Sequence, residues 1–151
     1  MAKESLYLDT SVASAYYDKK VKERQKETIK FWDEILPQYE VYISEITIEE
    51  LASTKEEILR ENQRKLTKSF KILKVNKEIN KLAMKYVEHK IFPERYIDDA
   101  LHVAIASFYG ISFLVSWNFE HLVKVRTRRC VNSVNTLEGF KEIEIVAPLE
   151  L

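Results

Sequence analysis

Glycine, proline and cysteine are all scarce in this sequence of 151 residues, which holds two, three and one of them. The sequence therefore has no glycine- or proline-rich linker, and it shows no internal repeat. We expect residues 1–151 to form a single domain, because this length supports one hydrophobic core. The lone cysteine, Cys130, excludes an internal disulfide and suits a reducing compartment.

An excess of charge of one sign is also lacking, because 24 Lys and Arg residues balance 24 Asp and Glu residues. This balance argues against tight, non-specific DNA binding through a general positive coat, although it allows a local basic patch. No apolar run is long enough to cross a bilayer, and the N-terminal residues show no apolar signal segment or cleavage site. We therefore expect a cytoplasmic protein with no membrane partner.

The motifs of several common enzyme classes are missing. The sequence has no G-x-G-x-x-G for a dinucleotide, no G-K-[ST] for a nucleoside triphosphate and no G-x-S-x-G nucleophile turn. Its three histidines and one cysteine do not have the spacing of a zinc site. A phosphoryl-accepting aspartate of the haloacid-dehalogenase type would need a second Asp at the position of Ser11. The remaining candidates for chemistry are carboxylates.

Short apolar segments alternate with long helical patterns along the chain. We predict strands at residues 5–8, 40–43, 112–116 and 142–146, and either a strand or an extended link at residues 70–75. Helices are predicted at residues 12–17, 21–36, 47–53, 55–68, 77–90 and 94–109. This alternation predicts a three-layer α/β fold in which helices flank a central, mostly parallel sheet.

Two acidic residues follow predicted strands. Asp9 comes directly after the first strand, and a carboxylate there would lie at the carboxyl edge of a parallel sheet, where such sheets bind ligands. Asp9 would serve equally well as the N-cap of the next helix. Glu50 follows the second strand, but Thr47-x-x-Glu50 has the form of a capping box, which by itself favours a capping role.

The predicted helix 94–109 is apolar on nearly all sides, which is typical of a buried helix. Asp98, Asp99 and His102 share its one narrow polar arc. Acids on a buried helix carry a desolvation cost, so a shared site explains them better than simple solvent contact does. Asn118, after the predicted strand 112–116, offers one more oxygen ligand near the same edge.

Carboxylates gathered in one crevice would repel each other and raise each other's pKa values. A hard divalent cation such as Mg²⁺ removes this conflict and prefers oxygen ligands. With such an ion, carboxylates alone can hydrolyse a phosphodiester. Asp9, Glu50 and Asp99 are therefore the predicted ligands of a Mg²⁺ or Mn²⁺ ion.

Four short segments together resemble the PIN domain family, and most of all its VapC-like toxin ribonucleases. They are Leu-Asp-Thr-Ser at 8–11, Ile-Glu-Glu-Leu at 48–51, Asp-Asp-Ala-Leu-His-Val-Ala at 98–104 and Leu-Val-Ser-Trp-Asn at 114–118. The resemblance implies a metal-dependent endoribonuclease, the toxin of a VapBC-type pair, with Asp9, Glu50 and Asp99 as its acids. It also implies an RNA substrate, a homodimer and an antitoxin protein that blocks the crevice.

The chain departs from the family pattern at Asn118, which stands where a fourth acid is expected. The neutral side chain lowers the negative charge of the site, so a catalytically weakened PIN fold that binds RNA or protein is the alternative function. Asp98, Ser116 and Thr10 are predicted accessory residues of the site.

The densest basic stretch follows soon after Asn118, and it is the predicted RNA-binding surface unless it is simply a solvated face. Its charged residues are Lys124, Arg126, Arg128 and Arg129.

Overall fold

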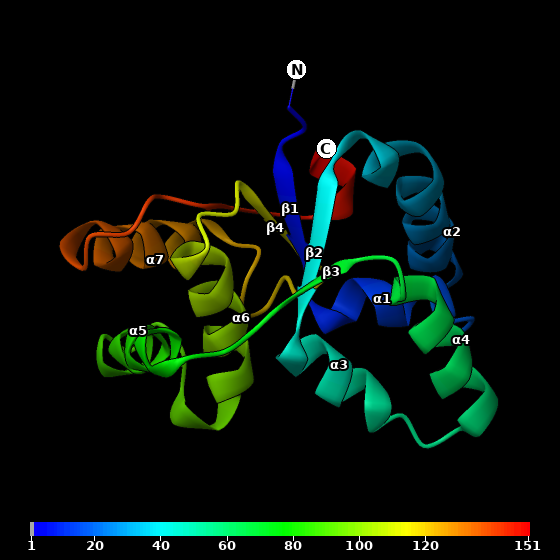
Figure 1. Ribbon diagram of the computed structural model, residues 1–151, viewed down its shortest axis with the longest axis horizontal. Helices are drawn as coiled ribbons and strands as arrows, with labels where there is room; N and C mark the ends of the chain where they lie inside the picture. The colour runs from blue at the N-terminus through cyan, green and yellow to red at the C-terminus, as the bar shows by residue number, and fades with distance from the viewer. Residues whose placement is uncertain (1) are drawn as a thin grey trace.

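Five strands form one parallel sheet between two groups of helices in the computed structural model, which describes residues 2–151 (Figure 1). The strands are β1 (Ser5–Leu8), β2 (Glu40–Ser44), β3 (Lys71–Leu73), β4 (Phe113–Val115) and β5 (Glu144–Val146), in the order β3-β2-β1-β4-β5. Every neighbouring pair is parallel. The predicted α/β fold is confirmed, and segment 70–75 contributes the edge strand β3.

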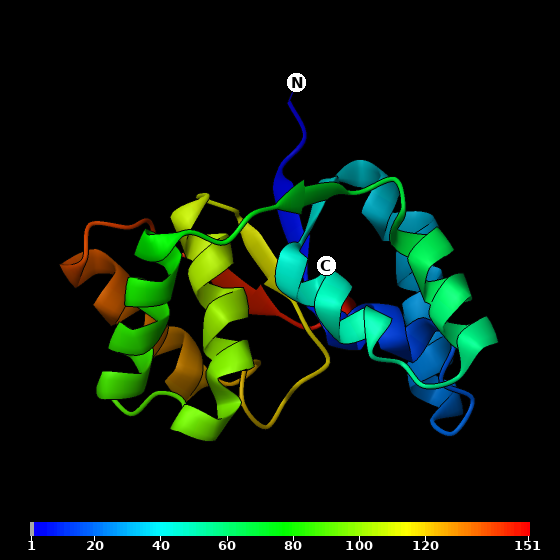
Figure 2. The ribbon, with the colours of Figure 1, turned by 60° about the horizontal axis from the view of Figure 1, so that its bottom comes forward.

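Helices cover both faces of this sheet, as Figures 1 and 2 show. The α-helices of residues 2–151 are α1 (Thr10–Tyr16), α2 (Lys22–Lys30), α3 (Glu45–Ala52), α4 (Glu57–Thr67), α5 (Lys77–Glu88), α6 (Ile97–Phe108) and α7 (Val125–Leu137). Leu6 and Leu8 of β1 belong to the core on the side of α1 and α2, and Tyr7 belongs to the core with α5, α6 and α7. All three side chains are buried, as expected for a central strand that is covered on both faces.

The helix predicted over 21–36 changes its winding before it ends. Helix α2 stops at Lys30, a π-helical turn follows over Phe31–Ile35, and a 3₁₀ turn covers Leu36–Gln38. Pro37 lies in the first turn of this 3₁₀ segment, where its missing N–H leaves no hydrogen bond unmade. The helical segment therefore ends at Gln38, two residues beyond the predicted end at residue 36.

Helix α3 starts two residues earlier than predicted because Ser44 is its N-cap. The Ser44 hydroxyl accepts hydrogen bonds from the N–H groups of Ile46 and Thr47, and Thr47 completes a capping box with Ser44. The predicted capping box between Thr47 and Glu50 is therefore wrong. Glu50 lies beyond the first turn of α3, which leaves its carboxylate free for other contacts.

Helix α7 is the one α-helix that the sequence analysis missed. Its sequence, Val-Arg-Thr-Arg-Arg-Cys-Val-Asn-Ser-Val-Asn-Thr-Leu, is rich in residues of low helix propensity. Thr127, Val131 and Val134 are buried at the i, i+4, i+7 spacing of a helix face. Packing of this face therefore outweighs the low helix propensity. The spacing of Thr127, Val131 and Val134 was the sequence feature that could have predicted the helix.

The carboxyl ends of all five strands lie at one edge of the sheet, because every pair is parallel. Helices α1 and α3 begin where β1 and β2 end, and α6 also begins near this edge (Figure 1). Within residues 2–151, no helix has the length and apolar character to span a bilayer.

Candidate active site

Asp9 lies at the junction of β1 and α1 and is almost completely buried. Its Oδ1 accepts hydrogen bonds from the Ser11 N–H at 3.1 Å and the Ser11 hydroxyl at 2.5 Å, so Asp9 is the N-cap of α1. Its Oδ2 accepts a hydrogen bond from the Ser116 hydroxyl, at the end of β4, at 2.6 Å. Burial raises the pKa of Asp9, although the charge of His102 and the two serines oppose this rise. Asp9 is therefore the N-cap of α1, and it also lies at the carboxyl edge of the sheet.

Glu50 projects from α3 toward the residue that follows Asp9. Its Oε1 accepts hydrogen bonds from the Thr10 hydroxyl at 2.8 Å and from His102 Nε2 at 2.6 Å. Burial alone would raise the pKa of Glu50, but these hydrogen bonds and the His102 charge outweigh burial and lower it. Glu50 is therefore held as a carboxylate, and the predicted accessory residue Thr10 contacts it directly.

His102 links Glu50 to the interior of the sheet. Its Nδ1 lies 2.6 Å from the Tyr7 hydroxyl, which lies 2.7 Å from the Ser44 hydroxyl. A carboxylate only accepts hydrogen bonds, so the Nε2 that contacts Glu50 carries a proton. Burial disfavours the charged form of His102, but Tyr7, Glu50 and Asp9 together raise the pKa of its imidazole above the ordinary value. His102 thus places a buried positive charge beside the acids.

Asp99 lies on α6, one turn before His102, and its side chain is 21% exposed. Its Oδ2 is 3.5 Å from Nδ1 of His121. Burial raises the pKa of Asp99 to about 6; His121 and His102 oppose the rise, and the negative charges of Asp9 and Glu50 add to it. The three acids are therefore close enough to act on one another electrostatically.

Asn118 organises the loop that carries His121. Its side-chain oxygen accepts a hydrogen bond from the His121 N–H at 2.9 Å, and its own N–H donates to the Ser116 hydroxyl at 2.9 Å. Ser116 thus joins this loop to Asp9. Asp98 is exposed, and within residues 2–151 no hydrogen bond or ion pair connects it to the other acids. The predicted assistance by Asn118 and Asp98 in metal binding stays a prediction.

The three acids come together at this edge without forming a tight group. No three His, Cys, Asp or Glu side chains of the described chain stand close enough to hold a metal ion as they are. Each acid instead has its own partner set: two serines for Asp9, Thr10 and His102 for Glu50, and His121 for Asp99. The predicted role of Asp9, Glu50 and Asp99 as metal ligands therefore remains untested by this arrangement.

The predicted basic surface divides in two because it lies at the start of a helix. Lys124 and Arg126 line a pocket that also contains His121, the neighbour of Asp99. Arg128 and Arg129 line a different pocket on α7, next to Asn132 and Glu142. Of the predicted basic residues, Lys124 and Arg126 therefore share a pocket with His121, whereas Arg128 and Arg129 do not.

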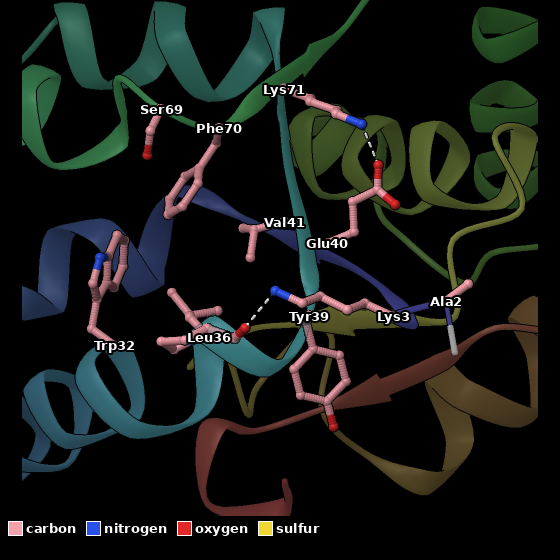
Figure 3. Close-up of a pocket in the computed structure, with 11 residues that line it drawn as sticks. Ala2, Lys3, Trp32, Leu36, Tyr39, Glu40, Val41, Ser69, Phe70 and Lys71 are labelled. Carbon is pink, nitrogen blue, oxygen red and sulfur yellow. Dashed lines mark hydrogen bonds and ion pairs between the residues drawn. The ribbon is translucent and has the colours of Figure 1, made fainter.

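Another pocket lies at the opposite edge of the sheet, where the strands begin (Figure 3). Its volume is about 620 Å³, and its lining includes Trp32, Tyr39 and Phe70. Its charged groups are already paired, because Lys71 forms an ion pair with Glu40 and Lys3 donates to the Pro37 carbonyl. This pocket does not contain any of the predicted site residues.

Residues 6–122 match the family described as the PIN domain. The chain belongs to the PIN domain family. No protein among the curated sequences matches it. Its fold is similar to that of VapC20 from Mycobacterium tuberculosis, described as a "Sarcin-Ricin loop cleaving toxin", with a TM-score of 0.62, 16% identity and coverage of 92% of this chain and 98% of that one.

Two further solved structures show the same fold at low identity. VapBC-1 from nontypeable Haemophilus influenzae matches with a TM-score of 0.61 at 17% identity, covering 96% of this chain and 98% of that one. FitAcB from Neisseria gonorrhoeae matches with a TM-score of 0.62 at 16% identity, covering 97% and 99%. At these identities the likeness establishes the PIN fold.

Two contacts of this PIN domain were not predicted from the sequence. They are the contact of His121 with Asp99 and the hydrogen bonds from Ser11 to Asp9. The spacing of the three histidines excludes a zinc site, and this spacing does not indicate that a single histidine contacts an acid. His102 carried one signal, because it shares the polar arc of α6 with Asp99. His121 carried no comparable signal, because its contact with Asp99 is tertiary, although the Asn118 turn next to it is local.

Proposed function

We propose that this PIN domain is a divalent-metal-dependent endoribonuclease that hydrolyses RNA phosphodiester bonds, the toxin of a VapBC-type toxin–antitoxin pair. The observation that carries the proposal is the meeting of three acids from three segments at the carboxyl edge of the sheet, with raised pKa values for Asp9 and Asp99. Strongly shifted acids in a crevice are typical of functional sites. The fold likeness to a toxin described as cleaving the sarcin-ricin loop supports RNA as the substrate class.

The chemistry of the acids fits a hard divalent cation. All three would offer carboxylate oxygens, which Mg²⁺ and Mn²⁺ prefer, and a cation would relieve the cost of burying Asp9 and Asp99 as anions. Glu50 would have to share or exchange its contact with His102 to take part. When bound, the ion would polarise a phosphate and activate water.

The surrounding residues would act by positioning. Ser11 and Ser116 fix both oxygens of Asp9, and Thr10 and His102 fix one oxygen of Glu50. The His102 charge lowers the repulsion between the acids while substrate, itself an anion, approaches. His121 lies against Asp99, with its Nδ1 3.5 Å from Asp99 Oδ2.

The test is cleavage of total cellular RNA in Mn²⁺ by the wild type and by Asp9→Asn. We expect wild-type cleavage at defined positions and its loss in Asp9→Asn, whose melting temperature should show that the fold is intact. Unchanged cleavage by Asp9→Asn would end the proposal. Parallel reactions on single-stranded DNA and a phosphomonoester separate a ribonuclease from a deoxyribonuclease or phosphatase.

The alternative is a PIN fold that binds RNA or protein without cutting. It is favoured by Asn118, whose side-chain oxygen is used in the turn to His121 instead of serving as a fourth acid. Calorimetry with Mn²⁺ discriminates the two functions, because a pure binding module has no need for specific metal uptake. Specific binding of Mn²⁺ that disappears in Asp99→Asn supports the nuclease.

The proposal includes two protein partners in the cytoplasm, an antitoxin and a second copy of the chain. The fold likeness to a structure described as a "Toxin-antitoxin complex from Klebsiella pneumoniae" motivates the first. Large apolar side chains that remain exposed, such as Ile58 and Leu137, motivate the second. Sedimentation of the purified chain, alone and after expression with its neighbouring genes, tests both.

A further inference from the structure

A small pocket with a cationic lining lies directly beside Asp99. Its volume is about 320 Å³, at the lower end of the range for small-ligand sites. His121 belongs to its wall and stands 3.5 Å from Asp99, so one side chain separates this pocket from the candidate site. The wall comes from three segments: the turn after α5, the 3₁₀ turn before α6, and the loop entering α7.

Four cations from these segments line the pocket, and one acid opposes them. They are Lys90, Arg95, Lys124 and Arg126, with Glu120 as the acid. All four cationic residues are exposed, and among the ion pairs of residues 2–151 none involves them. The pocket therefore carries a net positive charge that the protein itself does not neutralise.

The start of α7 adds to this positive potential. Helix α7 has 13 residues and begins at Val125, between Lys124 and Arg126. Its N-cap, Lys124, makes no side-chain capping hydrogen bond, so no acid or hydroxyl at that position offsets the first N–H groups. The N-terminal end of a helix favours anions for this reason.

The aromatic residues at the pocket do not form a free stacking surface. Phe92 is buried, the Arg95 guanidinium lies 4.9 Å from the Tyr96 ring centroid, and the His121 ring packs against Tyr96 at 4.1 Å. Bases stack on exposed aromatic faces, whereas phosphates bind clustered cations. The pocket therefore suits the nucleic-acid backbone better than a base.

We infer that this pocket, formed by Lys90, Arg95, Lys124 and Arg126, binds a backbone phosphate of single-stranded RNA next to the bond at the candidate site. The inference rests on the proposed function for its substrate, and it assigns the RNA path to the side of α6 and α7 where Asp99 and His121 lie. Recognition there depends on charge and is independent of base sequence. Arg128 and Arg129, which line the other pocket on α7, lie off this path.

The test measures binding in EDTA, so cleavage is not required. A fluorescent single-stranded RNA of mixed sequence is titrated with the full chain at several salt concentrations. Lys124→Gln combined with Arg126→Gln should weaken binding about tenfold and make the slope of log K against log salt shallower by about 0.7, because one lost phosphate contact contributes about 0.7 for a single strand. The same loss is expected for oligo(U) and oligo(A).

The matched control is Lys26→Gln combined with Lys30→Gln, which removes the same two charges from exposed positions. Both lie on α2, on the other side of the sheet from α7 (Figure 1). This variant should keep the wild-type affinity and slope, and melting curves should show that both variants fold. Equal losses in the two pairs would overturn the inference, because they would reflect net charge alone.

Two other outcomes separate this inference from its rivals. A Lys124/Arg126 variant that keeps full RNA affinity but loses binding to polyglutamate would assign the pocket to an acidic protein and overturn the inference. Failure of the proposed nuclease is seen separately, in Mn²⁺-dependent cleavage by the wild type and Asp9→Asn. The slopes in EDTA report on the pocket whether or not the chain cuts RNA.

Discussion

The two edges of the sheet place their charged groups in opposite environments. At the amino edge, Glu40 and Lys71 pair at the surface beside an aromatic pocket, and each shifts the pKa of the other toward the charged form (Figure 3). At the carboxyl edge, Asp9 and Asp99 are withdrawn from water, and burial raises both pKa values. The amino edge holds the aromatic pocket, while the unrelieved electrostatic cost lies at the carboxyl edge.

This difference distinguishes a structural surface from a site that needs a ligand. A surface ion pair is complete within the protein, and water screens it. Buried acids with raised pKa values stay costly until something positive joins them, which is why such groups mark functional sites. In this protein, the pKa shifts of the buried acids therefore indicate the site of chemistry better than the volume of a pocket does.

The largest expected effect comes from exchanging one glutamate at each edge for glutamine. Glu50→Gln should lower Mn²⁺-dependent RNA cleavage by about 100-fold or more, because it removes a carboxylate from the site where transition-state charge must be stabilised. Glu40→Gln makes the same chemical change beside the aromatic pocket and should leave cleavage unchanged. The measurement is kcat/KM on one RNA substrate for both variants.

Equal activities for these two variants would remove the functional distinction between the edges. A smaller loss in Glu50→Gln, with KM raised and kcat kept, would assign Glu50 to substrate binding. Circular dichroism of both proteins is the control for folding, because Glu50 also accepts the His102 hydrogen bond.

The second expected effect is stabilisation by the metal ion itself. An ion that binds only the folded chain adds about 2.7 kcal/mol to the free energy of unfolding at 100 times its dissociation constant. Mg²⁺ or Mn²⁺ should therefore raise the melting temperature of the wild type by several degrees, and this gain should largely vanish in Asp99→Asn. The same gain in both proteins would place the binding of the ion away from Asp99.

The third effect is stabilisation of the metal-free protein by Asp99→Asn. The folded pKa of Asp99 is about 6, above its ordinary value of 3.8, so ionisation of this carboxyl opposes folding. The cost is absent below pH 3.8, grows between pH 3.8 and 6, and is complete above pH 6. The substitution should add about 1–3 kcal/mol to the free energy of unfolding at pH 7.5 and little at pH 4.

Asp98→Asn is the matched control for this prediction, because Asp98 is the exposed neighbour of Asp99 on the same helix. Urea unfolding at both pH values should show a pH-dependent gain for Asp99→Asn and none for Asp98→Asn. A loss of stability in Asp99→Asn at pH 7.5 would mean that its contact with His121 outweighs burial, and the contrast between the edges would weaken.

The sequence predicted the layers of this fold because its buried strands and helix faces repeat with regular periods. It also predicted Asp9, Glu50 and Asp99 as the acids of the site, since each follows a strand or interrupts an apolar helix, and their role as ligands stays a prediction. It failed where tertiary contacts decide. Helix α7 forms through the packing of Val131 and Val134, and the contact between His121 and Asp99 joins two segments that no local pattern connects.

The misassigned cap of α3 shows the same limit on a smaller scale. Thr47 and Glu50 have the spacing of a capping box, but Ser44 and Thr47 have it too. Ser44 prevails because it ends β2 in an extended conformation and its hydroxyl is fixed beside Tyr7. That contact joins the cap to His102, and through it to Glu50, which no local pattern reveals.

The smallest expected effect comes from Lys71→Gln at the amino edge. Pairing with Lys71 keeps the pKa of Glu40 below its ordinary value of 4.5, so any stabilisation is present above pH 4.5 and is lost as the pH falls through the lowered pKa. Both groups are exposed and screened by salt, so the melting temperature at pH 7.5 and physiological salt should not change measurably. A loss as large as the gain in Asp99→Asn would show that the amino edge also depends on its charges. The two edges would then differ only in burial, and raised pKa values alone would no longer single out the carboxyl edge as the site of chemistry.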